Sequence, residues 1–235
     1  LRQKQWSTLA GKHPDITWHM GFAEIPAKPL LLVANEFFDA LPIRQYLHEE
    51  DGWKERKIGL SRDGKLEFVL EAATPPEALQ QEPVSDKLYE YSDAARAMAF
   101  VIANRIAMVG GSALIIDYGY DHDHGDTLQA VRHHRHHDVL EAPGTADLTA
   151  HVDFSTIIHA AAIGGCATYG PVGQGFFLNR LGAQARTEKL CENATQKQKE
   201  ALTSGLLRLT AAEQMGTLFK AMCIIHPELP KPEGF

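Results

Sequence analysis

The chain has 235 residues, of which 44% are hydrophobic and 23% charged, and this composition predicts one sizeable α/β domain or a domain with a small insertion. The formal net charge of −7 excludes tight binding to nucleic acid, which needs clustered lysine and arginine, and suits a basic protein partner. The longest apolar stretches are too short to cross a bilayer and three scattered cysteines favour a reducing compartment, so we expect a soluble intracellular protein.

The N-terminal part predicts a helix and two strands. The chain begins at Leu1 rather than Met, and Leu1–Gly11 resembles the end of a helix already under way, which predicts truncation at the N-terminus. Asp15–His19 mixes apolar and aromatic residues and predicts a short strand. Leu30–Ala34 is a continuous apolar run that stops at Asn35, which is typical of a strand buried on both faces of a parallel sheet.

A different pattern follows and indicates an insertion. Trp53–Ile58 and Lys65–Leu70 alternate apolar and polar residues on either side of a turn, which predicts a β-hairpin. Ala72–Ser85 is rich in Pro, Glu and Gln and predicts a loop. The predicted organisation is a main domain over residues 1–45 and 87–235, with an inserted antiparallel segment over residues 46–86.

A second buried strand is predicted at Ala113–Ile116, after a helix over Ser92–Val109 that ends at Gly110. This strand also stops at an acid, Asp117. Ligands of open α/β sheets bind beyond the carboxyl ends of the strands. We therefore expect the acidic ends of both strands to lie at one edge and to border a binding site.

The remaining chain is predicted to contain a long loop, then helices and strands. Tyr118–Leu148 is rich in His, Asp and Gly with few signs of regular structure, and loops of this size are usually functional. The other expected elements are a helix over Phe154–Gly164, a strand over Ala167–Val172, a helix over Thr187–Thr210 and a strand over Thr217–Ile225.

The segment Ala34–Pro42 is the first candidate site. Asn35, Glu36 and Asp39 directly follow a predicted strand, where carboxylate and amide oxygens can accept hydrogen bonds from a bound amine or guanidinium. Alternatively, Asn35 and Asp39 cap the next helix. Spacing alone favours neither interpretation.

Two further segments carry candidate residues. Asp117, Tyr118 and Gly119 form either a turn acid with a packed tyrosine or a ligand site, and the parallel with Asn35 and Glu36 favours the site. In the segment before Phe154, alternate positions would share one face of an extended chain. These positions are Asp147, Thr149, His151 and Asp153, of which Asp153 is alternatively the N-cap of the following helix.

Histidines and aspartates crowd one stretch in a way that suggests a metal site: His122, His124, His133, His134, His136 and His137, with Asp121, Asp123, Asp126 and Asp138. Consecutive histidines point in different directions, Arg135 would repel a cation, and no HExxH pair is present. We therefore favour a solvated loop. The glycine-rich run Gly170–Gly175 is a lone pattern late in the chain and is weak support for a nucleotide-binding loop.

Together these segments resemble the MidA-type methyltransferases, a family that includes the mitochondrial complex I assembly arginine methyltransferase. The long match at Pro143–Phe154 is the most specific, and the resemblance covers nearly the whole chain. The other matching segments are Asn35–Pro42, Asp117–Gly119, Gly125–Ala130, His134 with His137–Leu140, Gly170-Pro171 and Gln174–Leu178.

The resemblance implies a class I methyltransferase fold, which is a Rossmann-like α/β fold with a mostly parallel sheet and helices on both faces. It implies S-adenosylmethionine as cofactor, and Asn35 and Asp117 would end the fourth and fifth strands. The family's first strands, with the glycine-rich loop that binds the cofactor, would lie upstream of Leu1. We therefore expect this chain alone to bind the cofactor weakly and to be inactive.

From their predicted positions at the strand ends, we hypothesise roles for the candidate residues in methyl transfer to arginine. Glu36 and Asp39 would orient an arginine guanidinium, Asn35 would border the methyl donor, and His151 would accept the released proton. The expected binding residues are Asp117, Tyr118, Gly119, Asp147, Thr149, Asp153 and Gln174. The implied partner is a protein substrate such as a complex I subunit, in a homodimeric enzyme of the bacterial cytoplasm or the mitochondrial matrix. A non-catalytic assembly factor and a metal-dependent hydrolase using the histidine loop are the alternatives.

Overall fold

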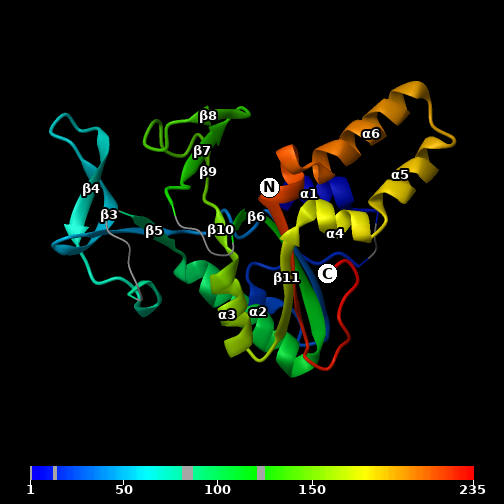
Figure 1. Cartoon of the computed structure of the whole chain (residues 1–235), viewed down its shortest axis with the longest axis horizontal. Helices are drawn as coiled ribbons and strands as arrows, with labels where there is room; N and C mark the ends of the chain where they lie inside the picture. The colour runs from blue at the N-terminus through cyan, green and yellow to red at the C-terminus, as the bar shows by residue number, and fades with distance from the viewer. Residues whose placement is uncertain (1, 13–14, 81–86, 121–124) are drawn as a thin grey trace.

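The computed structural model describes residues 2–12, 15–80, 87–120 and 125–235. The described residues form one main sheet covered by helices and two smaller sheets on one side of it (Figure 1). The N-terminal helix α1 (Arg2–Leu9) is as predicted, whereas the predicted strand over Asp15–His19 is wrong, since these residues pair with no strand in the described chain. The chain also contains two short 3-10 turns: η1 (Phe22–Glu24) lies in this N-terminal part, and η2 (Glu77–Leu79) lies farther along the chain.

The main sheet has the strand order β1 (Leu30–Asn35), β6 (Gly111–Tyr120), β12 (Phe219–Ile225), β11 (Ala167–Gly173), and the short β10 (Val152–Asp153) also pairs with β6. β1 and β6 run parallel, from Leu30 opposite Gly111 to Asn35 opposite Ile116, so their carboxyl ends share one edge as predicted. β12 is antiparallel to both neighbours.

The prediction that β1 is buried on both faces is wrong. Leu32 and Ala34 contact the core, but Leu31 and Val33 on the other face are 86% and 70% exposed. The described residues pair β1 with β6 alone and place no helix over this part of the second face. An apolar run therefore indicated a strand correctly, but not how much of the strand would be covered.

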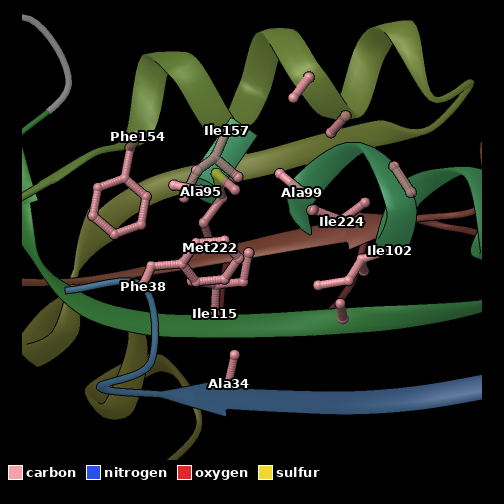
Figure 2. Close-up of a cluster of buried hydrophobic side chains, with 14 of the residues drawn as sticks. Ala34, Phe38, Ala95, Ala99, Ile102, Ile115, Phe154, Ile157, Met222 and Ile224 are labelled. Carbon is pink, nitrogen blue, oxygen red and sulfur yellow. The ribbon is translucent and has the colours of Figure 1, made fainter. Parts of the chain in front are cut away.

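Helices α2 (Asp93–Val109) and α3 (Phe154–Ile163) cover the first face of the main sheet (Figure 2). The helices pack closely because small residues meet: a Cβ added to Gly164 would lie 2.7 Å from the Ala103 Cβ. Phe38, from the loop after β1, inserts its ring between the sheet and Phe154 (Figure 2). The loop that carries the candidate residues is thereby anchored in the hydrophobic core.

The second face is covered by α4 (Gln174–Arg180) and the C-terminal Phe235. The single helix predicted over Thr187–Thr210 is wrong, because α5 (Ala183–Cys191) ends before Thr195 begins α6 (Gln196–Thr210) with a capping box. A π-helical turn, η3 (Ala212–Gly216), leads into β12. None of the helices in the described part of the chain has the length and apolar character needed to span a membrane.

The second sheet has the order β4 (Leu66–Ala72), β3 (Gly52–Leu60), β2 (Arg44–Glu49), β5 (Leu88–Tyr91), and all its neighbours are antiparallel. The predicted hairpin is confirmed as β3 and β4, which meet at Leu60 and Leu66. The sheet packs around the buried aromatic rings of Tyr46, Tyr89 and Tyr91. It extends beyond residues 46–86 at both ends, since its outer residues are Arg44 and Tyr91.

The third sheet has the order β8 (Arg135–His137), β7 (Gln129–Arg132), β9 (Asp147–Thr149), so the prediction of one structureless loop over Tyr118–Leu148 is wrong. His133 and His134 both have positive φ, 52° and 60°, and form the two-residue turn between β7 and β8. These two histidines therefore occupy a tight turn between strands. His122 and His124 lie outside the described residues, and the described part contains no cluster of three His, Cys, Asp or Glu arranged to hold a metal ion.

Candidate active site

The candidate site lies where β1 and β6 end. Asn35 is the last residue of β1 and pairs with Ile116, which precedes Asp117. Glu36 follows with a positive φ of 48°, and its N–H donates to the Ile116 carbonyl at 2.9 Å. This turn leads the next residues, Phe37–Asp39, to the end of β6. The acids of the two strands therefore meet at one edge, as the sequence predicted.

Asp117 anchors this loop. Its side chain is fully buried, and its Oδ2 accepts the N–H groups of Phe37, Phe38 and Asp39 at 3.1, 3.0 and 3.3 Å, while its Oδ1 accepts the Tyr118 N–H at 3.0 Å. Burial raises the pKa of Asp117 to about 6, the Asp39 charge adds to this rise, and the amide donors oppose it. Since backbone amides hold both oxygens, Asp117 positions the loop.

Asp39 is the buried acid that has a free oxygen. It is almost fully buried, and its Oδ1 has no hydrogen-bond partner among the described residues. Burial raises the pKa of Asp39 above its ordinary value, the Tyr118 hydroxyl opposes this, and the Glu36 carboxylate adds to it. The alternative that Asn35 and Asp39 cap a helix is wrong, because the next element is a strand that begins at Arg44.

Tyr118 and His151 form the neighbouring wall. Their rings meet edge to face with centroids 5.4 Å apart, and Tyr118 also packs on Phe219. Burial raises the pKa of Tyr118 to about 12 and lowers the pKa of His151, so at pH 7 we expect a protonated phenol beside a neutral imidazole. Thr149 lies close enough for its side chain to bond the Tyr118 hydroxyl, which opposes the rise in the tyrosine pKa.

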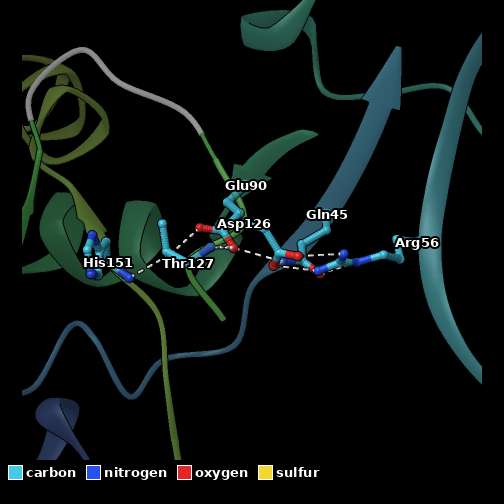
Figure 3. A network of polar contacts seen from close by, with 6 residues as sticks. All are labelled: Gln45, Arg56, Glu90, Asp126, Thr127 and His151. Atoms are coloured by element: carbon cyan, nitrogen blue, oxygen red, sulfur yellow. Dashed lines mark hydrogen bonds and ion pairs between the residues drawn. The ribbon is translucent and has the colours of Figure 1, made fainter. Parts of the chain in front are cut away.

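A chain of hydrogen bonds links this wall to the second sheet (Figure 3). The His151 backbone N–H donates to the Thr127 hydroxyl at 2.8 Å, and that hydroxyl donates to the buried Glu90 carboxylate. The Thr127 N–H donates to the same carboxylate at 3.0 Å, and the Gln45 amide donates to it at 2.7 Å. Sequence analysis missed Glu90 and Gln45, because only the pairing of β2 with β5 places them opposite each other.

The same network continues to Arg56 on β3. Its guanidinium donates to both Asp126 oxygens at 2.7 and 2.6 Å and to the Gln45 amide oxygen at 2.9 Å, and it stacks 4.4 Å from the centre of the Phe68 ring. Bidentate pairs of this kind fix geometry as well as charge. The pair therefore ties the second sheet to the segment that precedes the third sheet, and Asp126 was the only one of these residues in a recognised motif.

A groove of about 320 Å³ lies between these parts. The loop after β1 contributes Asp39 and Pro42, the second sheet contributes Ile58 and Phe68, and the segments around the third sheet contribute Leu148 with its neighbours. Its volume is at the lower end of the range of small-molecule sites, about 300–1,000 Å³. Asp39 is thus shared between the strand ends and this groove.

Other predicted site residues have partners that explain them within the fold. Asp153 is the N-cap of α3 and accepts the Ser155 N–H at 2.9 Å and the Thr156 hydroxyl at 2.7 Å. Gly119 lets β10 approach, since an added Cβ would lie 2.1 Å from the Val152 carbonyl oxygen.

The outer positions lie farther from the strand ends. Asp147 is exposed at the start of β9, opposite Val131. Gln174 follows β11 at the same edge of the main sheet as Asp117, but its buried side chain donates to the Leu209 carbonyl at 2.9 Å. The structure therefore groups Asn35, Glu36, Asp39, Asp117, Tyr118, Thr149 and His151. It gives Gly119, Asp153 and Gln174 contacts within the fold and leaves Asp147 exposed.

A mixed sheet with helices on both faces and acids at its carboxyl edge fits an α/β fold of the class I methyltransferase type. Two solved structures from Burkholderia thailandensis share it. One, an uncharacterised protein, superposes with a TM-score of 0.87 at 26% identity over 100% of this chain and 66% of its own. The other, bound to S-adenosyl-homocysteine, superposes with a TM-score of 0.83 at 27% identity over 96% of this chain and 61% of its own.

Residues 1–172 match the family described as "Putative S-adenosyl-L-methionine-dependent methyltransferase", and the chain belongs to this family. Curated relatives include the mitochondrial protein arginine methyltransferase NDUFAF7 homolog of Drosophila melanogaster, 37% identical over 88% of this chain and 49% of that protein. NDUFAF7 of Homo sapiens is 35% identical over 89% of this chain and 48% of that protein. The chain spans about half the length of these relatives.

The strand ends fit part of the family's cofactor. Asn35 and Glu36 are exposed at the end of β1, and the Asn35 amide donates to the Glu36 carboxylate at 3.3 Å. The exposed amide oxygen of Asn35 can accept hydrogen bonds from the ammonium or hydroxyl groups of S-adenosylmethionine. Asn35 would border the cofactor on the side of the chain where β1 has no paired strand among the described residues.

Proposed function

We propose that the protein is an S-adenosylmethionine-dependent methyltransferase that modifies arginine in a protein substrate. The observation that carries the proposal is the pair of acids at positions 36 and 39: Glu36 is exposed at the strand end, and the buried Asp39 has an oxygen without a partner among the described residues. A buried carboxylate with a free acceptor is costly unless a donor reaches it. An arginine side chain supplies such a donor together with a positive charge.

The chemistry of the acceptor matches these acids. A guanidinium is planar, always charged and offers five N–H donors in a fixed arrangement. Each charge-assisted hydrogen bond to a carboxylate contributes about 1.5–3 kcal/mol. Asp39 would hold one edge of the guanidinium and Glu36 the other, with the loop amides fixed on Asp117 keeping the two acids in place.

Bound S-adenosylmethionine supplies an electrophilic methyl carbon, and the protein has to align the acceptor nitrogen with it and exclude water. As the new nitrogen–carbon bond forms and the carbon–sulfur bond breaks, the guanidinium must lose one proton. His151 would accept it, because burial lowers the pKa of this histidine and keeps the imidazole neutral at pH 7. Tyr118, which contacts the His151 ring, would hold the imidazole in place.

The proposal is tested by methyl transfer from labelled S-adenosylmethionine to an arginine-containing peptide, using the full-length protein. Glu36→Gln and Asp39→Asn should each lower the rate at least tenfold, while binding of the cofactor, measured by calorimetry, stays within about twofold. Glu67→Gln, an exposed acid on β4, is the matched control and should keep the full rate. If both site variants keep the full rate, the two acids do not orient the acceptor.

The resemblance to the complex I assembly methyltransferase extends the proposal to the substrate and its place. We propose a complex I subunit as the acceptor, a homodimeric enzyme, and residues 46–86, together with the rest of the second sheet from Arg44 to Tyr91, as an insertion into the methyltransferase domain. The location would be the bacterial cytoplasm or the mitochondrial matrix. Mass spectrometry of arginine methylation in complex I, in cells with and without the protein, tests the acceptor. Binding of cofactor and partner without any methyl transfer would instead support a non-catalytic assembly factor.

A further inference from the structure

The groove between the two small sheets has an apolar rim above one acid. Ile58 on β3 and Leu148 on β9 are 58% and 52% exposed and line the groove from opposite sheets, and Phe68 on β4 lines it as well. In Figure 1 these sheets stand side by side on one side of the main sheet. Exposed large apolar side chains that converge on a groove are typical of a surface that binds another molecule.

The charged side chains that line the groove favour a positively charged ligand. Its charged lining residues are Asp39 and Arg56. The Arg56 charge is neutralised by the bidentate pair with Asp126, and its guanidinium is further engaged by Gln45 and Phe68. Asp39 keeps an oxygen without a partner among the described residues. The groove is therefore complementary to a chain segment that carries a positive charge toward Asp39 and apolar side chains toward the two rims.

We propose that this groove binds the acceptor segment and selects a target arginine that has a large apolar residue within two positions of it. The inference rests on the proposed function, because it takes Asp39 to face the guanidinium. Ile58 and Leu148 are its specificity-determining residues: in an extended segment, the side chains two positions from the arginine lie on the same face as the arginine and reach the rims of the groove. The Arg56–Asp126 pair keeps the two rims at a fixed separation.

The test compares two peptides that differ only at the positions two residues from the arginine, where one carries Leu and the other Ser, with the full-length protein and S-adenosylmethionine. We expect kcat/KM to be at least tenfold higher for the Leu peptide, which corresponds to about 1.4 kcal/mol. Ile58→Ser and Leu148→Ser should each remove most of this difference by raising KM for the Leu peptide. Leu60→Ser is the matched control, since Leu60 lies on the same strand, is 71% exposed and is not part of the groove.

Each alternative outcome is distinguishable. Equal kcat/KM for the two peptides, with both methylated, overturns the inference and leaves the proposed function standing. Variants that change a dimer into a monomer without altering peptide preference also overturn it, because the groove would then be an interface between two copies. A protein that binds S-adenosylmethionine but methylates neither peptide contradicts the proposed function itself.

Discussion

Asp117→Asn tests whether the buried Asp117, which holds the loop at the strand ends, ionises at a cost to stability. A rise of the Asp117 pKa from 3.8 to about 6 means that ionising this side chain in the folded protein costs about 3 kcal/mol, at 1.36 kcal/mol for each pKa unit. The folded state thus keeps a proton that the unfolded state releases between pH 4 and 6. Stability from this group is therefore complete below pH 4 and falls as the pH rises to about 6.

The side chain at position 117 of the variant cannot ionise, so the free energy of unfolding of the variant does not contain this decrease with pH. We expect the free energy of unfolding of the natural protein, minus that of Asp117→Asn, to decrease by about 3 kcal/mol between pH 4 and pH 7. Urea denaturation at several pH values measures both proteins, and Glu67→Gln controls for the loss of one exposed acid. Using the change with pH removes the separate cost of placing an amide against backbone N–H donors. Parallel stability curves from pH 4 to 7 would refute the buried-charge explanation.

Three further predictions concern residues that hold the site in place. Thr127→Val removes the hydroxyl that accepts the His151 backbone N–H, so kcat should fall about tenfold while cofactor binding stays unchanged. Thr127→Ser keeps a hydroxyl and should have the kcat of the natural protein. Equal kcat values in the two variants would contradict this role. Asp153→Ala should lower the free energy of unfolding by about 1 kcal/mol in urea and leave cofactor affinity unchanged, whereas a large loss of affinity would make it a binding residue. Gly119→Ala should lower the melting temperature by several degrees, because the added Cβ would meet the Val152 carbonyl; an unchanged melting temperature would show that β10 can shift freely.

The sequence predicted the elements in which local pattern and tertiary environment agree. The apolar run before Asn35, the helix before Gly110 and the alternating residues of the β3–β4 hairpin are all as expected. It also predicted that the acids after the two strands would meet, because parallel neighbouring strands must end at the same edge. The errors arose where the sequence pattern does not show which segments pack against a strand. Leu31 and Val33 belong to an apolar run, yet they are exposed.

For the candidate site, residue types could be proposed from the sequence, but their partners could not. Asp117 lies near the end of β6 and Asp39 follows β1, yet the first has its oxygens filled by four backbone N–H groups and the second keeps an oxygen without a partner in the described chain. Asp153 looked equally suited to a site and proved to be an N-cap. A carboxylate's role depends on which donors reach it, and these come from segments distant in sequence.

The sequence by itself determined that two strands carry acids to one sheet edge and that the chain between them carries a hairpin, although β6 continues past Asp117 to Tyr120 instead of stopping there as predicted. Only the tertiary structure decided how Glu90 reaches His151 through Thr127, and how Arg56 and Asp126 tie the second sheet to the third. The physical reason is that strand order and register are set by side chains that meet across the fold, and a one-residue change of register would turn Gln45 and Arg56 to the opposite face.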